Sequence, residues 1–339
     1  MNTILLHLLP DDAYLCVLQS MEIYEQLSYS LCSKNTKKAI KSLNLRAEQI
    51  NINVVDSIGI EIRVNNLKIY WSSMEHCNYF PDNQAIVHGG IRFILVDDKE
   101  TETNWTWNFG TWNFENLEFK DWLYHFCEVL HHPIIDHFHF YGENLDDYYI
   151  EPIQKIIKGL QVRCFGIWDE LTNEFAQQVL KSFPNYEKLL LDQSTFGKDK
   201  LNKCLVQNLE SFCVPRAERL EIDQVLVSNS VKIQLNTSLL NEKDFNRFMK
   251  LWIRGSNPRL KYFVTMGQPQ DGSVLLNENA ILKGIKRNQI PLDSEEVYGD
   301  FMDNYYNYTK LAGGYKIWSF NGTTAVIVLT DCRFEFIVE

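Results

Sequence analysis

From residue 117 to residue 264 the sequence alternates between segments of helical periodicity and short apolar segments of strand character. A first helix is predicted over 119–130, and strands are predicted over 134–140, 162–167, 188–191, 219–222, 231–235 and 260–264. Such alternation favours parallel strands, either in a leucine-rich-repeat-like array or in an open doubly wound sheet. The doubly wound sheet is disfavoured because no Gly-rich strand-to-helix turn is present, although a regular leucine-rich repeat is also absent.

The segment before this array has the period of two that is typical of antiparallel strands. Ile50, Ile52 and Val54 alternate with polar residues, and the segments 58–64 and 67–71 flank an Asn65-Asn66 turn. A further strand is predicted over 91–95, and the aromatic run 105–114 is predicted to pack on this sheet as strand and loop. Near the end of the sequence, Asn321-Gly322 predicts the turn of a hairpin.

The first 45 residues predict three short helices. Pro10 suits a first helical turn, and Asp11 and Asp12 suit the positive end of a helix. Ser33 is predicted to cap the third helix, which carries a basic face. The predicted fold is therefore α+β, with a helical domain over 1–45, an antiparallel β-rich segment over 46–116, and a strand–helix domain over 117–339 that is closed by a β-hairpin.

The composition restricts the classes of partner. The net charge of −11 would repel a phosphate backbone, so a nucleic acid is not expected. No run of 18 apolar residues and no export signal is recognisable, so we expect no membrane association and a cytoplasmic or nuclear protein. The eight cysteines form no CxxC pair, and we expect them to be reduced.

The N-terminal segment resembles the F-box. The resemblance rests on Leu8-Leu9-Pro10-Asp11-Asp12 and on the Ser-Leu-Cys-Ser-Lys segment at 30–34. Many F-boxes carry a Trp after that Cys, whereas this chain has Thr36 at the nearest position. The segment 33–37, Ser-Lys-Asn-Thr-Lys, is similar to the variant that is common in nematode F-box proteins.

Later segments resemble the F-box-associated domain of the same nematode group. They are Phe-Pro-Asn-Tyr at 183–186, Phe-Met-Lys-Leu-Trp at 248–252, Gly-Ser-Asn-Pro-Arg-Leu at 255–260 and Gly-Thr-Thr-Ala at 322–325. The resemblance implies the substrate-recognition subunit of an SCF-type ubiquitin ligase, which does no chemistry itself and needs no cofactor. It implies a Skp-type adaptor, through it a cullin and a RING protein, and a protein substrate held by the C-terminal domain.

The N-terminal helices also predict a docking surface on physical grounds. A segment of this length is near the lower limit for independent folding, so its apolar groups need a partner surface. The basic face of the third helix would speed the encounter with an acidic adaptor. The predicted adaptor-binding residues are Leu8, Leu9, Pro10, Asp11, Tyr14, Leu15, Leu18, Met21, Leu27, Leu31, Ser33 and Lys37.

Substrate contacts follow from the array, because alternate strand residues would line its open face. The predicted contacts are His139, Tyr141, Glu221, Asp223 and Lys261. Two alternatives remain open. One is a binding protein that sequesters its partner without degradation. The other is a metal-dependent enzyme that uses the histidines of the 131–139 segment, although no second pair of ligands has metal spacing.

Overall fold

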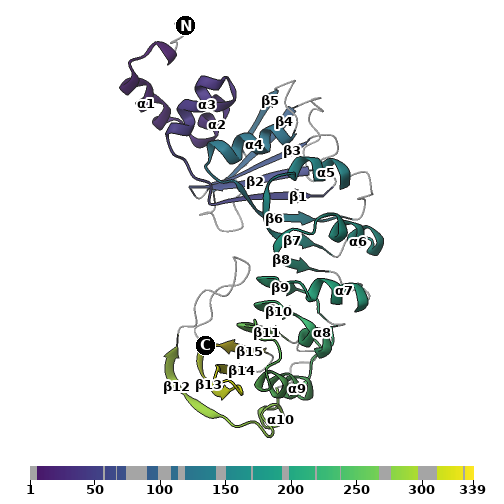
Figure 1. Cartoon of the computed structure of the whole chain (residues 1–339). Helices are drawn as coiled ribbons and strands as arrows, with labels where there is room; N and C mark the ends of the chain where they lie inside the picture. Colours follow the sequence, from purple (N-terminus) through teal and green to yellow (C-terminus); the bar gives the residue numbers. More distant parts are fainter. Residues whose placement is uncertain are drawn as a thin grey trace. The chain divides into compact units, whose positions relative to one another are not determined.

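The structure is a computed structural model, and the description covers residues 6–55, 58–65, 67–73, 90–97, 108–113, 119–142, 150–168, 171–192, 198–217, 220–236, 238–266, 276–296, 311–330 and 333–339 (Figure 1). The protein is α+β. It divides into two compact units, the first of residues 1–163 with 178–183 and the second of residues 164–177 with 184–339. The division falls within strand β7 (Gln161–Ile167) and within helix α6 (Asn173–Ser182), and each unit is described separately. The boundaries predicted at 45/46 and 116/117 stay a prediction.

The first unit begins with the short helices that the sequence predicts. A 3-10 turn, η1 (Leu6–Leu8), precedes α1 (Asp11–Ser20), α2 (Ile23–Leu31) and α3 (Lys34–Ser42). Leu18, Leu27 and Ile40 are buried, one from each of the three α-helices, and α2 contacts α3. Pro10 precedes the first turn of α1, and Tyr14 N donates to its carbonyl oxygen at 2.8 Å.

The sheet of the first unit is mostly antiparallel. Its strand order is β5 (Asn108–Asn113), β4 (Gly90–Asp97), β3 (Leu67–Ser73), β2 (Ile58–Val64), β1 (Gln49–Val54) and β6 (Ile134–Phe140). Only the β1–β6 pair is parallel among these strands, with Ile52 opposite Phe138, whereas Ile52 also lies opposite Ile60 in the antiparallel β1–β2 pair. The predicted meander is confirmed over β1 to β3. The ends of the aromatic run, 105–107 and 114, and Asn66 lie outside the described residues.

A buried carboxylate connects β1 to β6. Asp136 of β6 is 4% exposed, and its Oδ2 accepts a 2.9 Å hydrogen bond from the backbone N–H of Ile50. His132 Nε2 lies 2.7 Å from the same oxygen, and the Arg163 guanidinium pairs with Oδ1. Burial alone would raise the pKa of Asp136, but the hydrogen bonds from His132 and Ile50 outweigh it and lower that pKa. The paired carboxylate therefore fixes the register of the parallel strand pair.

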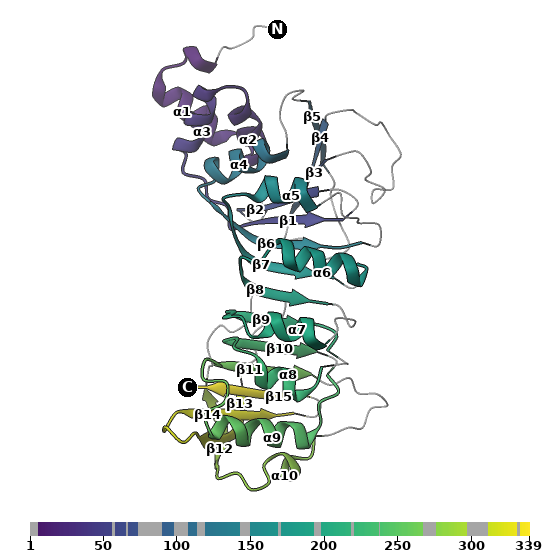
Figure 2. The ribbon, with the colours of Figure 1, turned by 45° about the vertical axis from the view of Figure 1, so that its right-hand side comes forward.

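Helix α4 (Phe119–Val129) contacts both α3 and α5 (Ile150–Ile157), and Figure 2 shows it between the N-terminal helices and α5. Trp122, Leu123 and Phe126 are buried on its apolar stripe. On its flank, His125 Nε2 lies 2.7 Å from Ser30 Oγ of α2. The Ser30 hydroxyl donates to the Leu27 carbonyl, so its oxygen accepts an N–H from a neutral His125. These contacts join the N-terminal helices to the rest of the first unit.

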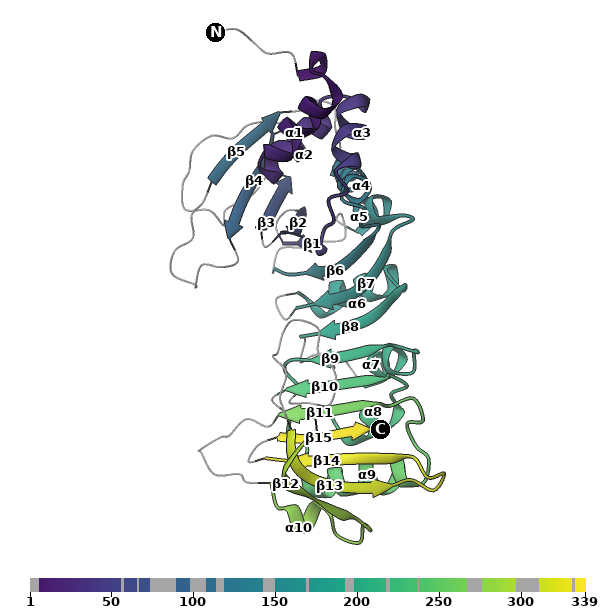
Figure 3. The ribbon, with the colours of Figure 1, turned by 90° about the vertical axis from the view of Figure 1, so that its left-hand side faces the viewer.

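The second unit begins with parallel strands. Strands β8 (Tyr186–Leu191), β9 (Ser211–Val214), β10 (Lys232–Asn236) and β11 (Tyr262–Met266) pair in this order. Helices α7 (Lys198–Leu205), α8 (Ile222–Val227) and α9 (Glu242–Ile253) connect them and line one side of the strands in Figure 2. Figure 3 shows the final strand, β15 (Arg333–Val338), between β11 and β14 (Thr324–Leu329). β13 (Leu311–Trp318) and β12 (Asn288–Glu296) continue the sheet in antiparallel fashion.

An aromatic cluster joins α9 to this sheet. The Phe245 ring stacks on Phe334 with centroids 4.3 Å apart, and the Phe248 ring meets Phe263 and Phe336 edge to face at 5.0 and 5.1 Å. All five rings are at most 1% exposed. Because aromatic side chains bury large areas, this contact is a major source of stability in the second unit.

In the second unit one predicted strand is wrong and two strands are missed. The strand predicted over 219–222 is wrong, because Glu221 forms a capping box with Gln224 and so begins helix α8. The four-residue strand β9 is missed, because it contributes only Phe212 and Val214 to the core. The long strand β12 is also missed, since its sequence, Asn-Gln-Ile-Pro-Leu-Asp-Ser-Glu-Glu, has few β-branched residues and contains a proline. The small helix predicted near 280–286 is present as α10 (Glu278–Ile281).

The Gly-Ser-Asn-Pro-Arg-Leu segment after α9 holds neighbouring connections together. Asn257 has a φ of 51°, a conformation that Asn tolerates, and it is 6% exposed. Its Nδ2 donates to the carbonyl oxygens of Val225 and Ser228, both at 2.9 Å, at the end of α8. Arg259 NH1 donates to the Asn229 carbonyl oxygen at 3.2 Å. The segment therefore has a structural role, in which its side chains donate hydrogen bonds to carbonyl groups at and just after the end of α8.

We predict that Asn257→Ala lowers the free energy of unfolding by about 2–4 kcal/mol, because two carbonyl groups lose a buried donor and Ala is disfavoured at positive φ. Asn257→Gly should cost less, since Gly adopts this φ without strain and loses only the hydrogen bonds. Urea unfolding followed by circular dichroism measures both values. Equal stability of the Ala variant and the wild type would contradict this role for Asn257.

A second prediction concerns acid stability. Burial, and to a lesser extent the charge of Lys37, lowers the pKa of His125 to about 4, whereas Glu128 acts in the opposite direction. In the unfolded chain His125 takes up a proton near its ordinary pKa of 6.5, so the folded state is disfavoured as the pH falls from 6.5 towards 4.

The wild type should therefore lose about 1–2 kcal/mol of stability relative to His125→Gln between pH 7 and pH 5, the lower value applying if solvent screens the partly exposed ring. Urea midpoints at several pH values measure the difference, and the other titrating groups cancel because both proteins contain them. A difference that is independent of pH over this range would show that His125 is not held neutral.

Candidate functional site: the N-terminal helices and their contact with α4

The N-terminal helices carry exposed apolar side chains on one part of their surface. Leu8 in η1 is 70% exposed and Leu15 in α1 is 40% exposed, although both are large and apolar. Leu9, Tyr14 and Val17 are half-buried nearby in the sequence. The two exposed Leu residues are seven positions apart in the sequence, and a surface on which such side chains gather is one that a partner can cover.

The predicted adaptor-binding residues divide into two groups. Leu18 and Leu27 are 1% and 0% exposed, so they belong to the core of the first unit. The others are exposed or half-buried: Leu8, Leu9, Pro10, Asp11, Tyr14, Leu15, Met21, Leu31, Ser33 and Lys37. The Tyr14 hydroxyl lies 3.2 Å from that of Tyr29, and burial together with this hydrogen bond raises the pKa of Tyr14 to about 12. The uncharged Tyr14 side chain therefore connects α1 to α2 through this hydrogen bond.

Ser33 and Thr36 explain why the Ser-Lys-Asn-Thr-Lys segment begins a helix. Thr36 N donates to Ser33 Oγ at 3.1 Å, and Ser33 N donates to Thr36 Oγ1 at 2.9 Å. This reciprocal capping box satisfies two N–H groups at the start of α3. The predicted cap at Ser33 is confirmed.

The basic face of α3 meets an acid that sequence reasoning missed. Lys37 Nζ lies 2.6 Å and Lys41 Nζ 3.1 Å from the two carboxylate oxygens of Glu128 in α4. Hydrogen bonds from Lys37 and then Lys41 lower the pKa of Glu128 to about 2, although its side chain is half exposed. His131 Nε2 lies 3.1 Å from the Lys41 carbonyl oxygen, and Ala47 N donates to the Leu130 carbonyl oxygen at 3.2 Å. The end of α3 and the end of α4 are thus connected at several points.

The residues predicted to contact substrate lie in different settings. In the first unit, His139 is 2% exposed and its Nδ1 lies 2.8 Å from the Tyr141 hydroxyl. In the second unit, Glu221 caps α8 and Asp223 lies in the first turn of α8, where it pairs with Arg247 at 2.7 Å. These two residues therefore belong to a helix rather than to a strand. Lys261 is exposed and directly precedes β11.

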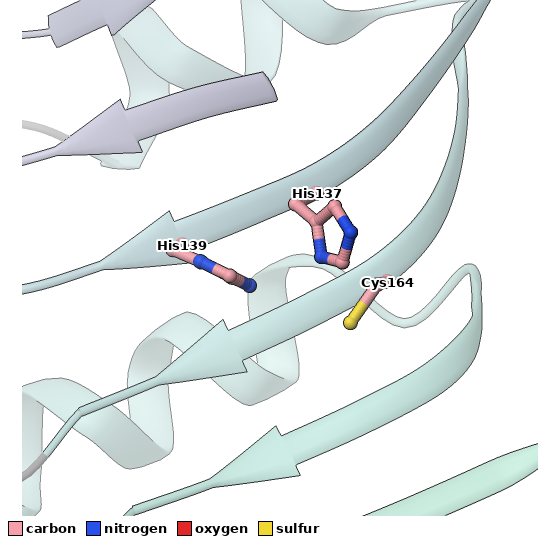
Figure 4. Close-up of side chains that lie close together, drawn as sticks. All are labelled: His137, His139 and Cys164. Carbon is pink, nitrogen blue, oxygen red and sulfur yellow. The ribbon is translucent and has the colours of Figure 1, made fainter. Parts of the chain in front are cut away.

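The histidines of the 131–139 segment fall into two groups, because His131 and His132 have separate partners whereas His137 and His139 lie side by side. His131 lies beside the Lys41 carbonyl oxygen and His132 beside Asp136. Figure 4 shows His137 and His139 on β6, and their ring centroids are 5.3 Å apart. Burial, and then the charge of His137, lowers the pKa of His139 to about 3, so its ring is neutral at ordinary pH. Cys164, also drawn in Figure 4, belongs to the second unit and is buried. The four histidines of the segment therefore do not converge on one point.

Among the described residues, no helix has the length and the apolar character that crossing a bilayer requires.

The comparisons with known proteins agree with both regions of the sequence that carry a resemblance. The model of the F-box domain matches residues 6–48, and the model of the F-box associated family matches residues 200–264. The chain is 23% identical over 257 residues to the F-box associated domain-containing protein sdz-33 of Caenorhabditis elegans, with 75% of this chain and 76% of that protein covered. No solved structure matches the chain significantly. The chain is therefore similar to F-box domains over residues 6–48 and to the F-box associated family over residues 200–264, which lie in its second unit.

Proposed function

We propose that this protein is the substrate-recognition subunit of an SCF-type ubiquitin ligase, and that η1 and α1 bind a Skp-type adaptor. The observation that carries the proposal is the exposure of Leu8 and Leu15 within the segment that matches the F-box. Burying two such side chains against a partner contributes about 1.5–3 kcal/mol for each one. Through the adaptor, the protein would recruit a cullin and a RING protein, in the cytoplasm or the nucleus.

The substrate is a protein, and we place its binding on the strand–helix region that includes the F-box-associated match. In this proposal the parallel strands β8 to β11 form a leucine-rich-repeat-like array, whose helices lie on one side of the strands and leave the other side for binding. Among the predicted contacts of the second unit, Glu221, Asp223 and Lys261 are all exposed, but only Lys261 lies beside a strand of the array, since Glu221 and Asp223 belong to the start of α8. The protein would act without catalysis of its own, by holding substrate lysines near the charged conjugating enzyme.

The double substitution Leu8→Asp with Leu15→Asp is expected to reduce adaptor binding at least 100-fold, because two exposed apolar anchors become charged groups that cannot be desolvated. Both positions face solvent in the free chain, so the fold should be retained. Binding to purified adaptor is measured by isothermal titration calorimetry.

Leu239→Asp is the matched control, because Leu239 is 65% exposed but lies in the second unit. This variant should bind the adaptor as the wild type does. Unchanged affinity of the double variant would show that the N-terminal surface is not the adaptor site. Failure of the wild type to bind the adaptor would contradict the proposed function.

The same double variant distinguishes proteins that bind through the adaptor from substrates that bind the chain directly. Affinity capture from cells with mass spectrometry should lose adaptor and cullin from the double variant, while substrate proteins remain. Inhibition of cullin neddylation should then raise the level of each retained partner. Partner levels that stay constant would favour the alternative of a sequestering protein over a ligase subunit.

A further inference from the structure

We infer that an ion-pair cluster, here called the clasp, fixes the orientation of the N-terminal helices relative to α4. The proposed adaptor-binding surface is then held in place by contacts within the chain. The clasp is defined as Glu128 with Lys37 and Lys41. Its role in positioning the adaptor rests on the proposed function, whereas the clasp itself does not.

The first observation is that one carboxylate receives two lysines from successive turns of a single helix. Lys37 and Lys41 are four residues apart, so both point from α3 to the same side. Their ammonium groups contact different oxygens of Glu128, at 2.6 and 3.1 Å. Two contacts of this kind restrain rotation of α3 about α4 more than a single ion pair would, because each oxygen has its own partner.

The second observation is that further hydrogen bonds flank the clasp. His125, one helical turn before Glu128, contacts Ser30 of α2 at 2.7 Å, and His131, just after α4, contacts the last turn of α3 through the Lys41 carbonyl oxygen at 3.1 Å. The Ala47 amide then donates to the Leu130 carbonyl oxygen where the chain passes from α3 to β1. The contacts involve both α2 and α3, so they fix an orientation rather than tether one point.

The third observation is that the clasp involves residues other than the exposed apolar ones. Leu8 and Leu15 lie in η1 and α1, whereas the clasp joins α3 to α4. Lys37, which the sequence analysis predicts to contact the adaptor, instead forms an ion pair with Glu128. The geometry therefore assigns Lys37 and Lys41 to an intramolecular contact and leaves η1 and α1 for the adaptor.

Hydrogen–deuterium exchange of the full-length protein tests the clasp. Glu128→Lys places three like charges together, and it should increase the exchange rate of the Ala47 amide about three- to tenfold, because exposed ion pairs contribute modestly and repulsion adds to their loss. The Tyr141 amide, which donates to Val54 within the sheet, should exchange at an unchanged rate. The triple variant Lys37→Glu, Lys41→Glu, Glu128→Lys reverses all the charges and should restore the Ala47 rate to within about twofold of the wild type.

Glu151→Lys is the matched control, because Glu151 pairs with Lys155 inside a single helix and its side chain has no partner on another helix or strand among the described residues. It should leave the Ala47 rate unchanged. An unchanged Ala47 rate in Glu128→Lys, or a triple variant that fails to recover, would overturn the clasp.

Adaptor affinity separates the clasp from the proposed function. Glu128→Lys should bind purified adaptor within about threefold of the wild type, since Glu128 is outside the proposed adaptor surface. A loss as large as that of the Leu8 and Leu15 double variant would mean that Glu128 itself contacts the adaptor, which overturns the clasp. If the wild type binds no adaptor, the proposed function fails, but the exchange experiment still decides the clasp.

Discussion

The packing of α4 is the contact on which the first unit depends. A three-helix segment of about 40 residues is too small to bury its own apolar groups, so it requires a surface to fold against. Helix α4 supplies that surface, because it contacts α3 on one side and α5 on another and buries Trp122, Leu123 and Phe126. Among the N-terminal helices, Leu8 and Leu15 are the large apolar side chains that stay exposed in the described part of the chain.

This division of the surface of the N-terminal helices has a physical reason. Leu18, Leu27 and Ile40 are committed to internal packing, whereas charged and hydroxyl groups of α2 and α3 make the directional contacts with α4. Apolar packing is not directional, so it stabilises the contact without selecting one orientation. Ion pairs and hydrogen bonds of defined geometry select the orientation, even though each contributes little free energy.

The sequence predicts elements well where the signal is local. The N-terminal helices, the Ser33 cap, the antiparallel strands β1 to β3 and the hairpin at Asn321-Gly322 each depend on residues within a few positions of one another. Glu128 could not be predicted as a partner of Lys41, because the two are 87 residues apart and Glu128 resembles any exposed acid on a helix. The strand expected at 219–222 failed for the opposite reason: a local capping box at Glu221 outweighed a short apolar pattern.

The position of β15 in the sheet affects how the chain folds during translation. Strand β15 lies between β11 and β14. Its residue Phe336 is opposite Phe263 of β11 on one side and opposite Ile327 of β14 on the other. The parallel strands therefore keep an open edge at β11 until residues 333–338 have left the exit tunnel. A nascent chain would present that edge until β15 pairs with it, and loss of residues 333–338 would separate β12 to β14 from β11 rather than simply shorten the sheet.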